Sequence, residues 1–466
     1  MFPSKTKMPT AILACLFFLG AVLRLVWLSD MEFFSDQQGI FRHAMGPLWN
    51  PDKNWVQNGL GIVTSVGVLS PGLTYWIYQI PAKIFSLDSP LELTLFLRLT
   101  NVAALAGFLF FALRVVERAE REVWLWAWAL LLVNPFAVFF QRRLWPPSIF
   151  PIFACFLLIA WWRRDRVWGA FLLGLLGALI AQIHLLAGLF WASLLLWAWA
   201  NRAQRASFLW RPLLLGAALG AIPAIPWLVY MIGVIQEGIG VGERHWEVAH
   251  QLRFWRYWFT QPFGLLLTYF LEPGGYFREY LAMPKLAGQA THLVLAIHTL
   301  VGALLLLFVG VLIRALLKLI CAARKERSWS AISAAFWGSS NTDSAVNAAF
   351  LGYGLSMMLK TFYVFRHYLI LTAPLEFAWL ARSALRANLL WGRRGLALLW
   401  VLQLGMTIFL LIYIHQNGGA PGAEYGHTYR EQLRMGEWTT NNNPIYHRDT
   451  FKPKKREQGI PQTFEF

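Results

Sequence analysis

Residues 167–200 read VWGAFLLGLLGALIAQIHLLAGLFWASLLLWAWA, a stretch without a single Asp, Glu, Lys or Arg. At about 1.5 Å per residue, one continuous helix over this run would be about 51 Å long, which exceeds the ~30 Å hydrocarbon core of a bilayer. The polar trio Gln182-Ile183-His184 lies near its middle. We therefore expect two membrane helices that meet at this trio.

The rest of the chain has the same apolar character. Hydrophobic residues make up 57% of the 466 residues and charged residues only 14%, whereas a soluble protein has about 25% charged residues. The sequence thus predicts an all-α polytopic membrane protein with about eleven transmembrane helices, within a range of roughly 10 to 13. The expected spans are 9–29, 91–114, 123–141, 147–162, 167–181, 185–200, 212–234, 291–317, 346–365, 367–381 and 395–415.

The net charge is +17, and the positions of the basic residues along the chain indicate the membrane topology. Most Lys and Arg residues lie in alternate connections between spans, which is typical of cytoplasmic loops. There is no RNA-binding signature, so no nucleic-acid partner is predicted. The basic connections fall on one side only if residues 72–87 do not cross the membrane, and this segment is therefore predicted to be a helix at the headgroup level. The N-terminus is then inside and the C-terminus outside.

This topology gives a transmembrane domain over residues 1–415, with outer loops at 30–90 and 235–290, and a short outer tail at 416–466. The three cysteines, Cys15, Cys155 and Cys321, give no disulfide framework. The sequence contains neither of the metal-binding motifs HExxH and CxxC, so no metal site is predicted.

Asp36 lies in Phe33-Phe34-Ser35-Asp36-Gln37, directly outside the first span. A carboxylate held at a membrane surface among aromatic side chains is suited to act as a base toward a hydroxyl group. A Ser-Asp pair is also ordinary helix-capping chemistry. Both interpretations stay open from position alone.

Two outer turns carry cations at the depth of a lipid phosphate. Arg142 and Arg143 follow a span that ends in Phe139-Phe140-Gln141, and Arg366 with His367 forms the second turn. The planar fork of arginine matches a phosphate group. Snorkelling to bulk headgroups is the alternative. Arg24, Arg98 and Lys360 lie within apolar windows, where snorkelling or pairing is expected.

Four short motifs, in this order along the chain, resemble the motifs of a known family of membrane enzymes. They are Phe34-Ser35-Asp36-Gln37-Gln38, Ser70-Pro71-Gly72-Leu73-Thr74-Tyr75-Trp76, Arg142-Arg143-Leu144-Trp145-Pro146-Pro147-Ser148 and Arg366-His367-Tyr368. The chain thereby resembles membrane glycosyltransferases of the GT-C class, in the bacterial glycosyltransferase family 39, which is related to protein O-mannosyltransferases and to the aminoarabinose transferase of lipid A.

The resemblance implies a GT-C-like fold and an inverting transfer of a sugar from a polyprenyl-phosphate donor to a hydroxyl acceptor on a glycan, lipid or protein. By match, Asp36 is the general base, and Arg142, Arg143, Arg366 and His367 bind the donor phosphate. The candidates for the substrate pocket are Tyr75, His184, Lys360 and Tyr368. The expected location is the inner or plasma membrane, with the site on the periplasmic or extracytoplasmic side.

Two departures from the family pattern leave the mechanism open. The family often has Asp-Glu at the base, where this chain has Asp36-Gln37, and some members have a second acid where it has Trp145-Pro146-Pro147. No cofactor is predicted, and a divalent metal ion stays an open alternative. The competing functions are a flippase for polyprenyl-linked glycans and a polymerase or ligase that uses diphosphate-linked glycans.

Overall fold

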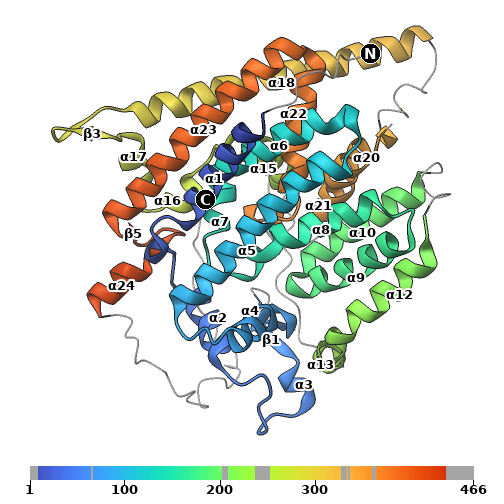
Figure 1. Ribbon diagram of the computed structural model, residues 1–466, viewed down its shortest axis with the longest axis vertical. Helices are drawn as coiled ribbons and strands as arrows, with labels where there is room; N and C mark the ends of the chain where they lie inside the picture. The colour runs from blue at the N-terminus through green and yellow to red at the C-terminus, as the bar shows by residue number, and fades with distance from the viewer. Residues whose placement is uncertain are drawn as a thin grey trace.

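The computed structural model describes residues 9–64, 67–201, 208–236, 252–326, 333, 336–338, 340–358 and 364–436. Over these residues the chain is a bundle of helices, and its strands form three small antiparallel pairs (Figure 1). The prediction of an all-α membrane protein is confirmed. The predicted outer loop 235–290 and the tail 416–466 lie partly outside the described residues, and Lys360 lies wholly outside them.

Four helical stretches in the described part of the chain are long and apolar enough to cross a membrane. They are α5 (Pro90–Phe110) with its extension to Val115, α12 (Trp210–Ala221) with α13 (Ile225–Gln236), α18 (Leu293–Glu326) and α23 (Leu389–Asn417). Shorter apolar helices pack beside them, namely α1 (Thr10–Leu25), α8 (Phe150–Trp162), α9 (Val167–Ile183) and α10 (Leu185–Ala200).

The predicted break in the run 167–200 is confirmed. α9 ends at Ile183 and α10 begins at Leu185, and His184 between them is extended, with φ −155° and ψ 118°. α9 also packs closely on α12, because glycines face the neighbouring backbone. A Cβ atom at Gly216 would lie 2.0 Å from the carbonyl oxygen of Phe171, so only glycine permits this approach.

Other predicted spans are interrupted or begin later than expected. The stretch 123–141 is divided into α6 (Arg121–Val133) and α7 (Pro135–Phe140), because Pro135 cannot continue the hydrogen-bonding of α6. The stretch 346–365 contains the end of α20 (Asn341–Asn347), a π-helical turn and α21 (Gly354–Met358). The span expected at 367–381 begins later, as α22 (Ala373–Ala387).

Ion pairs join two of the predicted inner connections to each other. Arg393 of α23 pairs with Glu122 at 2.5 Å, and Arg382 pairs with Glu120 at 2.7 Å. At the other end of α23, His415 contacts Asp30 of the first outer loop at 2.6 Å. Arg393 and His415 are separated by about 33 Å of helix. The described parts of these predicted inner and outer connections therefore contact opposite ends of α23.

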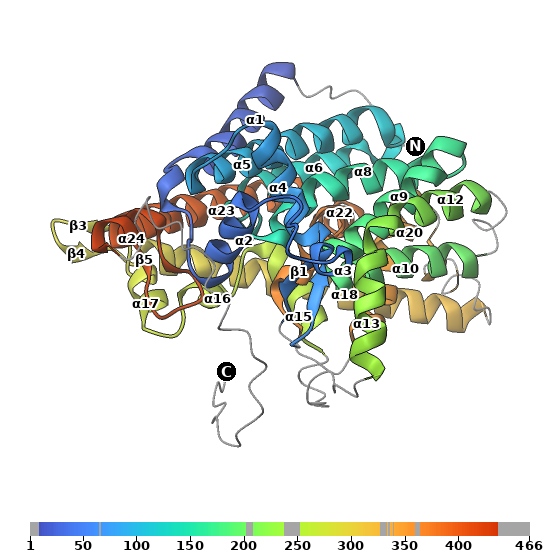
Figure 2. The ribbon, with the colours of Figure 1, turned by 90° about the horizontal axis from the view of Figure 1, so that it is seen from below.

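The loop 30–90, which the sequence predicts to be outside, folds as a small layer across its end of the bundle (Figures 1 and 2). Its elements are α2 (Ser35–Met45), α3 (Trp55–Asn58), β1 (Leu60–Val63), β2 (Leu69–Pro71) and α4 (Leu73–Ile84). The segment 72–87 is thus helical as predicted. α4 packs on α2, and Lys83 Nζ donates to the carbonyl of Met45 at 2.9 Å.

After α23, the chain turns back onto this layer. We refer to residues 418–436 as the C-terminal strap; it contains β5 (Gly419–Ala420), β6 (Gly426–His427) and α24 (Tyr429–Met435). The remaining described elements between α13 and α18 are α15 (Arg253–Thr260), α16 (Thr268–Leu271), α17 (Tyr276–Leu281), β3 (Lys285–Leu286) and β4 (Gln289–Ala290).

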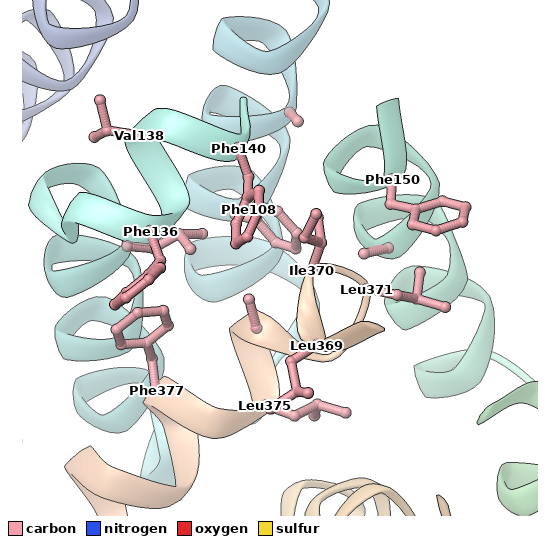
Figure 3. Close-up of a cluster of buried hydrophobic side chains, with 14 of the residues drawn as sticks. Phe108, Phe136, Val138, Phe140, Phe150, Leu369, Ile370, Leu371, Leu375 and Phe377 are labelled. Atoms are coloured by element: carbon pink, nitrogen blue, oxygen red, sulfur yellow. The ribbon is translucent and has the colours of Figure 1, made fainter. Parts of the chain in front are cut away.

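A buried aromatic core lies between α7, α5 and α22. Figure 3 shows Phe136 and Phe140 of α7 pointing toward Phe108 of α5 and Phe377 of α22, with the turn that contains Leu369 and Ile370 between them. The core connects the two turns that carry the predicted cations, since α7 leads into Arg142 and the other turn begins at Arg366.

Candidate functional site

Asp36 is the second residue of α2 and its side chain is exposed, although Glu32 and Gln37 beside it are buried. The N-cap of α2 is Phe34, whose backbone N–H donates to Oε1 of Gln37 at 3.1 Å. Asp36 is therefore not the capping residue. Among the described residues no hydrogen bond to its carboxylate is found, so this group is available to solvent and to a ligand.

Arg143 lies directly opposite this acidic loop. Its Nη2 donates to Oε1 of Glu32 at 2.6 Å, and both side chains are almost fully buried. Nε2 of Gln37 donates to the same oxygen at 3.3 Å. The pair joins the segment before α2 to the turn after α7, and so brings two predicted outer regions together.

The charges of this cluster shift each other's titration. Burial raises the pKa of Glu32 to about 8, although the neighbouring Arg143 lowers it. Burial lowers the pKa of Arg143, but the acidic groups around it, led by Glu32, raise that pKa above its ordinary value. The charge of Asp36 contributes to both shifts. The exposed carboxylate of Asp36 thus lies within electrostatic reach of the hydrogen-bonded side chains of Glu32 and Arg143.

The guanidinium of Arg143 keeps unused donors. In the described part of the chain, its Nε and Nη1 are buried without a hydrogen-bond acceptor. Oε1 of Glu424, from the C-terminal strap, lies 3.7 Å from Nη1, which is longer than a hydrogen bond. The hydroxyl of Tyr269 donates to the same carboxylate at 3.4 Å. Buried donors of this kind need an acceptor, which a bound water molecule or an anionic ligand would supply.

An aromatic wall continues from Arg143. Its guanidinium lies over the ring of Trp145 at 4.9 Å, and Trp145 packs edge-on against His367 at 4.5 Å. The ring of His184 lies 5.8 Å from that of His367 and 5.2 Å from that of Tyr368. The candidates His184, His367 and Tyr368 therefore form one group, which Trp145 connects to Arg143.

Arg142 occupies a different position from its neighbour. Its Nη1 donates to the carbonyls of Leu23 and Arg24 at 2.9 and 3.2 Å, and its Nη2 donates to Trp27 at 3.2 Å. Carbonyls at a helix C-terminus lack partners within the helix. Arg142 thus satisfies the end of α1 and is fully buried there.

Arg366 is also occupied by protein groups. It donates to the carbonyl of Leu265 and to the hydroxyl of Thr260, both at 3.1 Å, and lies 3.9 Å above the ring of Phe136. Tyr75 of α4 stacks on His43 of α2 with ring centroids 3.9 Å apart. These contacts place Arg366 and Tyr75 in separate packing arrangements.

Sequence reasoning did not single out Glu32, Glu424 or Tyr269 as site residues. Glu32 was visible as an outer acid close to Asp36. Glu424 and Tyr269 carry no local signal, because only the return of the C-terminal strap brings them to Arg143. Within the described residues, no group of three His, Cys, Asp or Glu side chains could hold a metal ion.

Comparisons with known proteins give one distant likeness. No protein-family model matches the sequence, and no curated protein matches it significantly. The structure is similar to the crystal structure of the Archaeoglobus fulgidus oligosaccharyltransferase in the apo form, with 13% sequence identity and a TM-score of 0.41. The match covers 95% of this chain and 59% of that chain, so this chain spans about three fifths of that protein's length.

Proposed function

We propose that this membrane protein transfers a sugar from a polyprenyl-phosphate-linked donor to a hydroxyl acceptor, on the extracytoplasmic side of an inner or plasma membrane. One observation carries the proposal: an exposed carboxylate, Asp36, lies within electrostatic reach of a buried arginine, Arg143, that has unused N–H donors. A glycosyl transfer from a lipid phosphate needs these two groups, a base for the acceptor and a cation for the leaving phosphate.

In this reaction Asp36 accepts the proton of the acceptor hydroxyl. The acceptor oxygen forms a bond to the anomeric carbon from the face opposite the lipid phosphate, and the bond between that carbon and the phosphate oxygen breaks. The anomeric configuration is inverted. Arg143 stabilises the charge that develops on the departing phosphate, because its Nε and Nη1 are oriented without a competing hydrogen bond among the described residues.

The other candidate residues take different parts in the proposal. The group of Trp145, His184, His367 and Tyr368 offers aromatic and imidazole surfaces beside Arg143 that suit the sugar or the acceptor. Arg142 and Arg366 donate to protein carbonyl and hydroxyl groups. In the proposal these two arginines stabilise the structure around the site, and Arg143 is the arginine that binds the phosphate.

Purified protein mixed with a panel of polyprenyl-phosphate sugars tests the proposal. The expected result is release of free polyprenyl phosphate together with a glycosylated hydroxyl acceptor of inverted anomeric configuration. Movement of intact lipid-linked sugar across a vesicle bilayer without release of polyprenyl phosphate would instead identify a flippase. Activity restricted to diphosphate-linked donors would identify a polymerase or ligase.

A further inference from the structure

The C-terminal strap is bound to the loop that precedes Asp36. The backbone N–H of Tyr429 donates to the carbonyl of Met31 at 3.0 Å, and the side chain of Gln432 donates to the carbonyl of Phe33. Gln38 of α2 donates to Gln432 at 3.0 Å. The strap is thus part of the structure that surrounds the site.

The position of Glu424 follows from its neighbour in the strap. Tyr425 is buried, its hydroxyl donates to the carbonyl of Asp30 at 2.6 Å, and its N–H donates to the carbonyl of Phe270 at 3.2 Å. Gly419 and Gly426 have φ values of 118° and 63°, which favour glycine and let the chain turn tightly around this point. Glu424 is consequently held facing Arg143.

Two glutamates contact Arg143 in different ways. Glu32 is hydrogen-bonded at 2.6 Å, and its side chain is 4% exposed. Glu424 is 3.7 Å away, and its side chain is 48% exposed. The first is a fixed structural partner. The second borders the unused Nη1 donor from the solvent side, where a ligand phosphate would approach.

We propose that Glu424 determines which phosphate charge the site accepts, a role that rests on the proposed function. A sugar phosphate diester carries one negative charge, and a sugar diphosphate carries two. Repulsion by the Glu424 carboxylate acts on each of these charges, so it disfavours the diphosphate more strongly than the monophosphate. Glu424 is therefore a specificity-determining residue that selects monophosphate-linked donors.

The size of the effect follows from Coulomb's law. Removing one unit charge about 6 Å from the ligand changes affinity by roughly three- to tenfold per ligand charge, for an effective dielectric constant of about 40 to 80. The ratio of monophosphate to diphosphate affinity should change by the same roughly three- to tenfold.

The experiment measures binding of an isoprenyl methyl phosphate and the corresponding isoprenyl methyl diphosphate to the full chain in detergent. Glu424→Gln should tighten binding of both lipids, and that of the diphosphate more. The matched control is Glu431→Gln, because Glu431 lies in the same strap and pairs with Arg434. This variant makes the same change in net charge and should leave the affinity ratio unchanged.

Four outcomes would overturn the inference. Equal shifts for both lipids in Glu424→Gln, or weaker binding of both, would show that Glu424 does not select by charge. The same change of ratio in Glu431→Gln would assign the effect to net charge. If the wild-type protein binds neither lipid more tightly than Arg143→Gln does, the proposed phosphate site itself fails, and the inference fails with it.

Discussion

At the scale of single residues, Asp36 is the group whose loss should stop the reaction. Asp36→Asn preserves the size of an exposed side chain and removes the base, so turnover should fall by ~10²–10⁴-fold, whereas donor affinity should not fall. Single-turnover rates and donor binding, measured on the same preparation, separate the two quantities. Retention of activity within a few-fold would mean that Asp36 is not the base.

Glu32 gives the site an expected dependence on pH. Its raised pKa of about 8 means that below this pH the carboxyl keeps its proton and the charge of Arg143 is available to the donor phosphate. As pH rises through about 8, the ionised Glu32 competes for that charge and donor affinity should fall. Glu32→Gln resembles the protonated form, so its affinity should vary little across this range.

The same shift affects stability. A carboxyl whose pKa is raised by folding contributes stability that is complete below its ordinary pKa and is lost as pH rises toward about 8. The free energy of unfolding should therefore decline over this window in the wild-type protein, and decline less in Glu32→Gln. Thermal unfolding in detergent at a series of pH values measures the difference.

The adjacent arginines should respond differently to neutralisation. Arg143→Gln should weaken donor binding by roughly 10- to 150-fold, since a hydrogen bond to a charged group contributes about 1.5–3 kcal/mol. Arg143→Lys should restore part of this affinity, because the charge remains and the planar fork does not. Arg142→Gln should lower the melting temperature and change donor affinity little, because the contacts of Arg142 are with carbonyls of α1 and of Trp27.

The sequence predicts Asp36 and Arg143 at one membrane surface, but it does not distinguish Arg143 from Arg142. Both are predicted outer arginines beside the same aromatic span, and only the path of α1 decides which one faces its carbonyls. Glu424 was beyond sequence reasoning for a similar reason. Its partner is distant in the chain, and no local pattern records that contact.

At the scale of elements, the glycine contact between α9 and α12 yields a test. Gly216→Ala would place a methyl group 2.0 Å from the carbonyl oxygen of Phe171, so the helices must separate and the melting temperature should fall. Gly233 lies in α13 with no atom within 4 Å of the added methyl group. Gly233→Ala should leave stability unchanged or raise it, because alanine favours a helix by about 1 kcal/mol over glycine.

Elements were predictable where periodicity and breaking residues agree. The polar trio at 182–184 marked the turn between α9 and α10, and charge parity together with composition marked α4 as a separate helix. The division of α6 from α7 was missed, because the apolar run continues through Asn134-Pro135 and hydropathy alone does not register the backbone break. The late start of α22 was missed for a similar reason: residues 368–371 before it, Tyr-Leu-Ile-Leu, are apolar and do not differ from a helix by composition.

At the scale of the whole molecule, the two ends of the bundle should face different compartments. In a cysteine-free background, single cysteines at positions 80 and 434 should react with an impermeant thiol reagent in intact cells or spheroplasts, and a cysteine at 386 should react only after permeabilisation. Ile80, Arg434 and Arg386 all have exposed side chains, so burial inside the protein does not prevent labelling at these positions. Labelling only at 386 would reverse the orientation.

The position of Arg142 has a mechanical consequence. Arg142 donates hydrogen bonds to carbonyls at the end of α1, and the chain continues from there to Asp36. Its immediate neighbour Arg143 is the proposed phosphate ligand and donates to Glu32 in the same segment. The segment that leads to the proposed base and the turn that carries the proposed cation are therefore joined by hydrogen bonds, through Arg142 to the end of α1 and through Arg143 to Glu32. In a relative of this protein that binds a bulkier sugar or acceptor, the additional space would have to lie on another side of the site. The C-terminal strap, in which Glu424 is half exposed, borders such a side. Changes in the strap would enlarge the site without altering the hydrogen bonds of Arg142 to α1.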